Sequence, residues 1–358
     1  MDDGRRNEAP GEGPGEGPAE GADRAPPLAS LLVLGFNQER HTRAVVEAAF
    51  AQTYEPLEIV LSDDGSSDRT FAIMQAMAEG YRGPHRVVLN RNEPNRGIVG
   101  NVNRLMELSR GELVVKNDGD DVSLPHRVER LVAAWLASGR RIKALGSDVL
   151  RVDAEGREIG PLGRPRLWRS ERTPLAILRD NLYLLGASSA WSREVFDRFG
   201  PIDGSAVVED TIIPFRAAVL GEIGFVEEPL VRYRTGGISG LTPGRGFGWN
   251  MMYGQRLKLI RLHMGTRLAA LRDMERVEFP GREACVRDCE RFLERRRYQL
   301  DLAERRRRER LAALAPALRR SVSERTPFYA YMTLKYLLDR PAMLAYDAKN
   351  LWKRRSLS

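Results

Sequence analysis

The chain is 358 residues long, enough for one large domain with an appendage or for two domains. Hydrophobic residues make up 42%, charged residues 30% and aromatic residues 7%, which excludes a wholly disordered, collagen-like or fibrous chain. The net charge of +8 is unevenly distributed, because Lys and Arg strongly outnumber Asp and Glu from Met251 onward, whereas the preceding part is slightly acidic. We expect these two parts to have different roles.

Residues 1–27 are predicted to be a disordered tail, since their Gly, Pro and Glu composition offers little apolar surface to bury, and they lack the apolar run of a secretory signal. The longest apolar runs, 28–36 and 328–332, are far shorter than the roughly 20 residues that span a bilayer, so no membrane-spanning helix is expected. Cys285 and Cys289 have helical spacing and favour packing over a disulfide. A reducing, cytoplasmic location is therefore expected.

Short apolar runs alternate with stretches of helical periodicity along the first third of the chain. Strands are predicted at 28–36, 57–61, 86–90 and 112–115, with helices at 42–52, from about 69, and at 98–108. Parallel strands need crossover connections of this kind. The predicted fold class is α/β, a mainly parallel sheet flanked by helices.

Polar clusters follow three of these strands, at 36–39, 63–66 and 118–121. In open parallel sheets, ligands bind beyond the carboxyl ends of the strands. The three clusters are therefore candidate sites.

The cluster Asp118-Gly119-Asp120-Asp121 places three carboxylates on one loop, where they repel one another unless a cation neutralises them. Mg²⁺ and Mn²⁺ prefer carboxylate oxygens combined with the phosphates of a substrate. The alternative is an ordinary acidic turn, because Asp and Gly are common in loops. The spacing alone leaves both interpretations open.

Two further acidic clusters each have two interpretations. In the run 63–68, a carboxylate could accept hydrogen bonds from a base or ribose, although helix capping explains half of the residues. Glu209 and Asp210 fall in the first turn predicted for the helix at 212–220, where the helix dipole favours acidic residues. The functional alternative is a general base that takes a proton from an acceptor hydroxyl.

Five stretches are specific through their order and spacing: SLLVLGFNQER, AFAQTYEPLEIVLSDDGSSDRT, NEPNRGIVGNVNRLMELSRGELVVKNDGDDVSLPHRV, GASSAWSREVFDRFGPID and VVEDTIIPFRAAVLGEIGFVEEPLVRYR. On these stretches, residues 30–240 resemble a family 2 glycosyltransferase with the GT-A fold. The resemblance implies an inverting enzyme that uses a nucleotide-diphosphate sugar and Mn²⁺ or Mg²⁺.

The resemblance also implies roles for individual residues. The nucleotide-sugar site would comprise Phe36, Asn37, Glu39, Asp63, Asp64, Asn95, Gly97 and Asp118. The metal ligands would be Asp118 and Asp120, the catalytic base Asp210 and its companion Glu209. The acceptor side would include Gly186, Ala187, Ser188, Ser189 and Trp191.

The function implied is the transfer of one sugar, from a uridine or thymidine diphosphate donor, to a hydroxyl of a glycan or lipid-linked acceptor. Two departures from the family pattern concern the site. The turn after the first strand reads Leu34-Gly35-Phe36-Asn37, and Thr235 follows Tyr233-Arg234 where many members carry a histidine, which leaves the third metal ligand open. The Gln-X-X-Arg-Trp pattern of processive synthases is missing.

Two rival functions remain. A dinucleotide-dependent oxidoreductase is disfavoured because the first strand-to-helix turn lacks Gly-X-Gly-X-X-Gly. A non-catalytic scaffold protein would keep the fold and dock through its basic C-terminal region.

Residues 241–358 are predicted to be a basic, mainly helical region that follows a catalytic domain at 28–240. An apolar helical stripe is expected at Cys285, Cys289, Phe292, Arg296, Leu300 and Ala303. Aromatic and basic residues at 326–358, which a proline at 341 divides into two short helices, suit peripheral contact with an anionic inner membrane face. The alternative is a helical pair that packs on the catalytic domain, and no nucleic-acid partner is expected.

Overall fold

The computed structural model describes residues 25–163, 166–235, 249–304, 312–324 and 326–337. Residues 1–24 of the predicted tail, the arginine run at 305–308 and residues 338–358 lie outside these ranges. The strands are β1 (Ala29–Gly35), β2 (Leu57–Asp63), β3 (Arg86–Arg91), β4 (Leu113–Asp118), β5 (Val122–Ser123), β6 (Ile142–Val152), β7 (Glu158–Pro161), β8 (Ala190–Ser192) and β9 (Glu222–Arg234). The α-helices are α1 (Glu39–Phe50), α2 (Thr70–Gly80), α3 (Gly97–Leu108), α4 (Arg127–Ala137), α5 (Pro174–Arg179), α6 (Glu194–Phe199), α7 (Ile212–Leu220), α8 (Trp249–Arg276), α9 (Arg282–Glu304), α11 (Leu314–Ser323) and α12 (Phe328–Leu337).

In the described part of the chain, nine strands form one sheet in the order β3-β2-β1-β4-β8-β6-β9-β5, with β7 paired to β6. The strands β1 to β4 are mutually parallel where they pair, as the alternation with helices predicts. The strands β5, β7 and β8 run antiparallel to their neighbours, so the sheet is mixed. These three are too short or too irregular in pattern to be recognised in the sequence.

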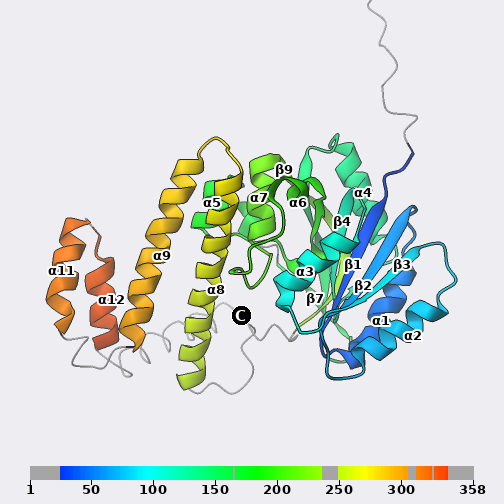
Figure 1. The fold of residues 1–358 in the computed structure, drawn as a ribbon, viewed down its shortest axis with the longest axis horizontal. Coiled ribbons are helices and arrows are strands. Elements are labelled where there is room, and N and C mark those ends of the chain that lie inside the picture. Colours follow the sequence, from blue (N-terminus) through cyan, green and yellow to red (C-terminus); the bar gives the residue numbers. More distant parts are fainter. Residues whose placement is uncertain (1–24, 164–165, 236–248, 305–311, 325, 338–358) are drawn as a thin grey trace, which may run out of the picture.

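The sheet has a hydrophobic core on each face, because both faces are covered by helices (Figure 1). Alternate residues of β1 divide between the two cores: Leu32 and Leu34 pack with α3, α6 and α7, whereas Leu31 and Val33 pack with α1, α2 and α4. This burial on both faces explains why β1 is a continuous apolar run.

The C-terminal helices follow one another away from the sheet in the order α8, α9, α12 and α11 (Figure 1). Helices α8 and α9 share the core of the sheet, through Ala270 and Met274 on α8 and the buried free cysteines Cys285 and Cys289 on α9. Beyond them, Leu302, Ala313 and Met332 form a separate small cluster that joins α9 to α11 and α12.

The predicted apolar stripe of α9 is confirmed at the two cysteines and only in part farther along, where Ala303 packs against the small cluster around Leu302. The next fully buried apolar residues are Leu293 and Leu302, while Phe292 and Leu300 are only half-buried. Tyr329 on α12 is fully buried and lies edge-on to Tyr298 of α9, with ring centroids 5.0 Å apart. That ring therefore packs in the helical unit instead of facing a membrane.

None of the helices in the described ranges combines the length and apolar character that a bilayer crossing requires.

Candidate active site

The carboxyl ends of the parallel strands bring the predicted clusters together. Gly35 at the end of β1 pairs with Asp63 of β2, and Leu34 pairs with Asp118 of β4. The loop after β4 also approaches the β1–α1 loop closely, because a Cβ on Gly119 would overlap the Leu34 carbonyl and the Gln38 side chain. Only glycine allows this approach.

Lys116, inside the buried strand β4, lies at the centre of the site. Its Nζ is 2.8 Å from Oδ1 of Asp118 and 2.5 Å from Oε1 of Glu209, and its side chain is only 4% exposed. Burial would lower the pKa of Lys116, but the charges of Asp118, Glu209 and Asp210 raise it overall. The lysine is therefore a permanent cation that joins the acidic loop after β4 to the acidic pair before α7.

Glu209 and Asp210 precede α7, which begins at Ile212. They therefore lie just before the first turn of the helix, and not within it as predicted. The Glu209 side chain is buried, and Asp210 is half-buried. Burial and the neighbouring charge of Glu209 raise the pKa of Asp210 well above its usual range, although Lys116 opposes this. A carboxylate with a raised pKa is suited to accept a proton near neutral pH.

Gly186 is the residue that lets these groups meet. A Cβ at this position would lie 2.7 Å from Oδ1 of Asp210, 2.7 Å from Nζ of Lys116 and 3.2 Å from Oε1 of Glu209. Gly186 therefore lies against the carboxylate predicted to be the base.

The other residues assigned to the acceptor side do not support that role. Trp191 on β8 is fully buried in the core of the sheet, beside Phe196, because its strand pairs with β4 and β6. Ser188 and Ser189 are buried and donate hydrogen bonds to backbone carbonyls of their own turn, while the carbonyl of the buried Ala187 accepts one from Arg127. These side chains stabilise the turn that carries Gly186.

Arg127 at the start of α4 holds this turn against the end of β4. Its guanidinium is fully buried and donates to the backbone carbonyls of Lys116 and Ala187 at 2.7 and 2.9 Å, and to Asn117 and Ser123 side chains at 3.0 and 2.8 Å. Burial lowers the pKa of Arg127 to about 10, which leaves it charged at neutral pH. Arg127 thus fixes the position of the loop that carries Asp118, Asp120 and Asp121.

Asp120 lies at a cavity of about 370 Å³ between the β4–β5 loop and the start of α1. Burial and, secondly, the charge of Asp118 raise the pKa of Asp120 to about 6. The residues that line the cavity are Asn37, Gln38, Glu39, Arg40, His41, Asp68, Asp120, Ala154, Arg234 and Thr235. The cavity therefore combines an acidic loop with basic side chains, as an anionic ligand accompanied by a cation requires.

Asp121 has a structural role. Its carboxylate is buried and accepts a hydrogen bond of 2.7 Å from the backbone N–H of Arg234, at the end of β9. Burial and the charges of Asp118 and Asp120 raise the pKa of Asp121. Asp121 thus ties the acidic loop to the last strand.

Asp118 and Asp120 supply two carboxylate oxygens of the kind that Mg²⁺ and Mn²⁺ prefer. Within the described ranges, no three His, Cys, Asp or Glu residues are grouped to hold a metal ion. These ions commonly take one or two carboxylates and complete their coordination with substrate phosphates and water. The donor set therefore fits a metal bound together with a diphosphate.

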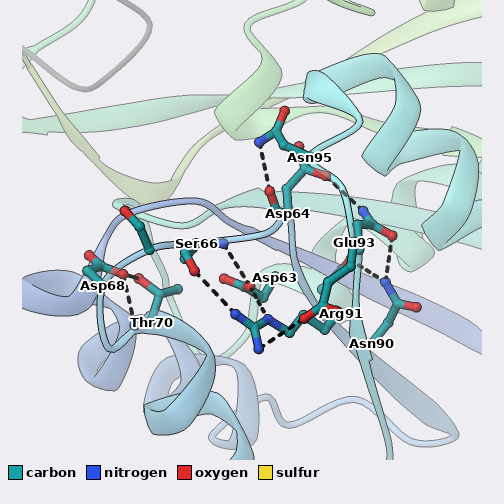
Figure 2. Close-up of polar contacts among 12 residues, drawn as sticks. Asp63, Asp64, Ser66, Asp68, Thr70, Asn90, Arg91, Glu93 and Asn95 are labelled. Atoms are coloured by element: carbon teal, nitrogen blue, oxygen red, sulfur yellow. Dashed lines mark hydrogen bonds and ion pairs between the residues drawn. The ribbon is translucent and has the colours of Figure 1, made fainter.

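The β2–α2 and β3–α3 loops form a second network at the same edge of the sheet (Figure 2). Asp64 is buried and accepts hydrogen bonds of 2.9 Å from the Asn92 side chain and from the backbone N–H of Arg96, while Asn95 donates to the Asp64 carbonyl at 2.7 Å. Gly97, at φ +72°, donates to the Asn95 side chain at 3.0 Å. The structure therefore brings Asp64, Asn95 and Gly97 together.

Asp63 is completely buried beneath this loop. It accepts a hydrogen bond of 3.0 Å from the backbone N–H of Ser66, and Nε of Arg91 lies 3.5 Å from the same oxygen (Figure 2). Asp63 therefore supports the loop and is not exposed to a ligand.

The β1–α1 turn faces this network. Asn37, at φ +52°, accepts hydrogen bonds from the backbone N–H and the hydroxyl of Ser67, and Glu39 accepts one of 3.1 Å from the backbone N–H of Arg69. Phe36 is 38% exposed. The polar side chains fix the turn, and the phenyl ring is accessible.

Three basic residues of the site escaped the sequence interpretation: Lys116, Arg127 and Arg234. For Lys116 a signal existed, because a lysine between two valines and the acidic cluster interrupts a strand that is otherwise apolar. A buried lysine in such a strand needs carboxylate partners.

The comparisons with known proteins agree with this geometry. The family described as Glycosyl transferase family 2 matches residues 30–196. EpsE of Bacillus subtilis is 31% identical over 130 residues, which cover 36% of this chain and 46% of EpsE, so the chain spans about half of that relative. The succinoglycan biosynthesis protein ExoO of Rhizobium meliloti is 26% identical over 251 residues, which cover 69% of this chain and 68% of ExoO.

Among solved structures, the mannosyltransferase PcManGT from Pyrobaculum calidifontis, in complex with GDP-Man and Mn²⁺, has a TM-score of 0.51 at 19% identity. The similarity covers 94% of this chain and 91% of PcManGT, so it includes the C-terminal helices. At this identity, it establishes the fold. Residues 30–196 thus match glycosyl transferase family 2, and the chain has a GT-A fold like that of PcManGT.

Proposed function

We propose that the chain transfers one sugar from a nucleotide-diphosphate sugar, with UDP or dTDP as the nucleotide, to a hydroxyl of a glycan or lipid-linked acceptor, with inversion. The observation that carries this proposal is the bridge made by Lys116 between Asp118 and Glu209. It joins a donor-side carboxylate to the acidic pair that contains the base.

The donor would lie along the carboxyl edge of β1, β2 and β4. Asp64, Asn95 and Gly97 border the position proposed for the base and ribose, with Phe36, Asn37 and Glu39 on the opposite side. Arg40 and Arg234 line the cavity at Asp120 and would attract the diphosphate. The GDP-Man and Mn²⁺ of PcManGT support a nucleotide sugar as donor and a divalent cation as cofactor.

In the proposed reaction, the acceptor oxygen attacks the anomeric carbon from the face opposite the diphosphate. Asp210 takes the hydroxyl proton, and the bond from the anomeric carbon to the diphosphate oxygen breaks, with its electron pair leaving on the diphosphate. A divalent cation held by Asp118 and Asp120 would stabilise that leaving charge when bound. Lys116 keeps Glu209 and Asp118 in place beside the base.

The acceptor class is inferred from one relative. ExoO is a succinoglycan biosynthesis protein, which favours a glycan under assembly. A lipid-linked glycan would also present the hydroxyl that the mechanism needs.

The donor half of the proposal is tested by thermal-shift measurements with uridine, thymidine, guanosine and cytidine diphosphates, each with and without Mn²⁺. A ligand at roughly 100 times its Kd adds about 2.7 kcal/mol to the free energy of unfolding, enough to shift Tm visibly. We expect one nucleotide to give a Mn²⁺-dependent shift in the wild type that Asp120→Ala loses. No shift with any nucleotide would favour the non-catalytic scaffold.

The base assignment is tested with the isosteric variant Asp210→Asn. Removing a general base typically lowers the rate by about 10²- to 10⁴-fold, so hydrolysis or transfer of the donor should fall to that extent while nucleotide binding is retained. Asp197→Asn, at an exposed position on α6, is the control and should behave as wild type. Equal loss of nucleotide binding and turnover in Asp210→Asn would contradict the assignment.

A further inference from the structure

A second cavity, of about 500 Å³, lies among α5, α9 and α12 and shares no residue with the one at Asp120. Its lining consists of Arg179, Asp288, Arg291, Phe292, Arg295, Arg296 and Phe328. Four arginines thus surround one cavity that contains a single carboxylate. Such an excess of like charge destabilises the free protein and attracts anions.

Two of these arginines have neither an ion pair nor a side-chain hydrogen bond in the described part of the chain. Arg179 is held by Asp180, with Nη2 of the arginine 2.9 Å from the carboxylate, and Arg296 donates a hydrogen bond of 2.7 Å to Gln299. By contrast, neither Arg291 nor Arg295 forms an ion pair within the ranges that the structure describes, although the charge of Arg295 is near enough to Glu324 to help lower the pKa of that carboxyl. Their guanidinium groups remain available to a ligand.

Aromatic rings hold the arginines in place. The guanidinium of Arg295 lies 5.5 Å from the ring centroid of Phe328, and that of Arg296 lies 4.9 Å from the centroid of Phe292. On Phe292 there is a second guanidinium, that of the fully buried Arg267, at 4.6 Å. Cation–π stacking restricts these side chains before any ligand binds, which reduces the entropy lost on binding.

Arg267 adds positive charge behind the cavity. Its Nε and Nη1 are buried without a hydrogen-bond partner in the described structure, and only its Nη2 donates, to the carbonyl of Leu178. A buried guanidinium with two unused donors makes the surroundings of Phe292 still more favourable for an anion.

From this geometry we infer that the cavity among α5, α9 and α12 binds a phosphate- or diphosphate-bearing ligand other than the sugar donor. Guanidinium groups recognise phosphate through paired charge-assisted hydrogen bonds, which explains a lining of arginines instead of lysines. Phe292 and Phe328 provide apolar surface for the part of the ligand next to the phosphate. The ligand is either a soluble phosphate ester or the phosphate headgroup of a lipid.

The test measures sodium pyrophosphate binding to the full chain by isothermal titration calorimetry in EDTA, without nucleotide. We expect Arg291→Gln/Arg295→Gln to weaken binding about tenfold or more, because both of these positive charges are lost. Arg297→Gln is the matched control, since this arginine is exposed on the same helix and does not line the cavity, and it should change affinity less than about twofold. Circular dichroism checks folding, and Arg291→Gln alone replaces the double variant if the latter is unfolded.

A second measurement separates the two sources of phosphate. Vesicles of phosphatidylcholine with phosphatidic acid are compared with phosphatidylcholine alone in co-sedimentation. Phosphatidic acid-dependent binding that the double variant loses assigns a lipid headgroup, whereas pyrophosphate binding without vesicle binding assigns a soluble ester. Absence of both, or equal weakening by the double variant and Arg297→Gln, would overturn the inference. Arg40 and Arg234 at the donor cavity could also attract pyrophosphate, but the variants change only the cavity among α5, α9 and α12, so their effect distinguishes it from the donor site.

Discussion

At Gly186, the absence of a Cβ leaves room for three charged side chains of the site. Lys116, Glu209 and Asp210 meet around its Cα, and a Cβ there would overlap both the lysine and the predicted base. The network of charges as it stands leaves no room for a Cβ at this position, so a side chain here would require Lys116 and Asp210 to shift.

We expect Gly186→Ala to displace Asp210 and lower turnover at least about tenfold, while nucleotide binding is retained. The overpacking should also lower the free energy of unfolding by about 1–3 kcal/mol. Steady-state kinetics and urea denaturation provide the two measurements. Gly204→Ala is the matched control, since a Cβ there meets nothing within 4 Å. Unchanged turnover in Gly186→Ala would show that the contact has no functional importance.

Lys116 gives a second prediction at the residue scale. Replacing it with methionine would leave the buried carboxylate of Glu209 without its cation, a change that typically lowers the free energy of unfolding by about 3–5 kcal/mol. Lys258→Met, at an exposed position on α8, should change it by less than about 0.5 kcal/mol. Urea denaturation compares the two variants, and equal stability would contradict the bridging role.

At the scale of elements, α7 is held to α8 by a buried ion pair. Nε and Nη2 of Arg216 each lie 2.7 Å from a carboxylate oxygen of Asp273, and both side chains are at most 1% exposed. The guanidinium also donates to the backbone carbonyls of Gly200 and Pro201. Because α7 directly follows Asp210, this pair helps to fix the position of the predicted base.

Removing the carboxylate in Asp273→Ala should lower the free energy of unfolding by about 3–5 kcal/mol, because Arg216 would remain buried and charged without a partner. The control is Glu275→Ala, which removes an exposed ion pair with Arg272 and should change stability by less than about 1 kcal/mol. Guanidinium denaturation of both variants measures the difference. Similar midpoints would show that the buried pair contributes no more than the exposed one.

A pH-dependent element contact involves His263 of α8, whose ring nitrogen lies 2.8 Å from the Asn181 side chain after α5. Burial and the nearby Arg267 lower the pKa of His263 from 6.5 to about 4. Between these values the unfolded chain binds a proton that the folded chain does not, so stability falls as the pH falls from 6.5 to 4.

His263→Gln should therefore reduce the acid sensitivity of the unfolding free energy over this pH range. Leu259→Gln, at an exposed position on the same helix, is the control: it removes no titratable group and should leave the slope unchanged. Urea denaturation at several pH values measures how the free energy of unfolding changes with pH. An unaltered slope in His263→Gln would contradict the assignment.

At the scale of the whole molecule, the C-terminal helices differ in how they join the fold. Helices α8 and α9 contribute Ala270, Met274, Cys285 and Cys289 to the core of the sheet, whereas α11 and α12 are attached through the small cluster around Leu302. In the basic region, α8 and α9 therefore complete the core of the sheet, whereas α11 and α12 are attached at its periphery.

Deleting residues 312–358 should lower Tm by only a few degrees, because little apolar surface of the sheet is uncovered. Deleting 277–358 should lower it by more than about 10 °C, or prevent folding, because it removes α9 from the core. Differential scanning calorimetry of both truncations provides the comparison. Similar melting of the two would show that α9 is peripheral as well.

The sequence by itself determined the strands and helices of the first third and the clusters at Asp64, Asp118 and Asp120. Those features depend on local periodicity and on loops that directly follow strands, so they are visible in the order of the residues. The antiparallel strands, the burial of Trp191 and the bridge from Lys116 to Glu209 were decided only by the tertiary structure. These features join segments that are far apart in the chain. Their contacts depend on the order in which the strands pair, and this order leaves no periodic pattern in the sequence.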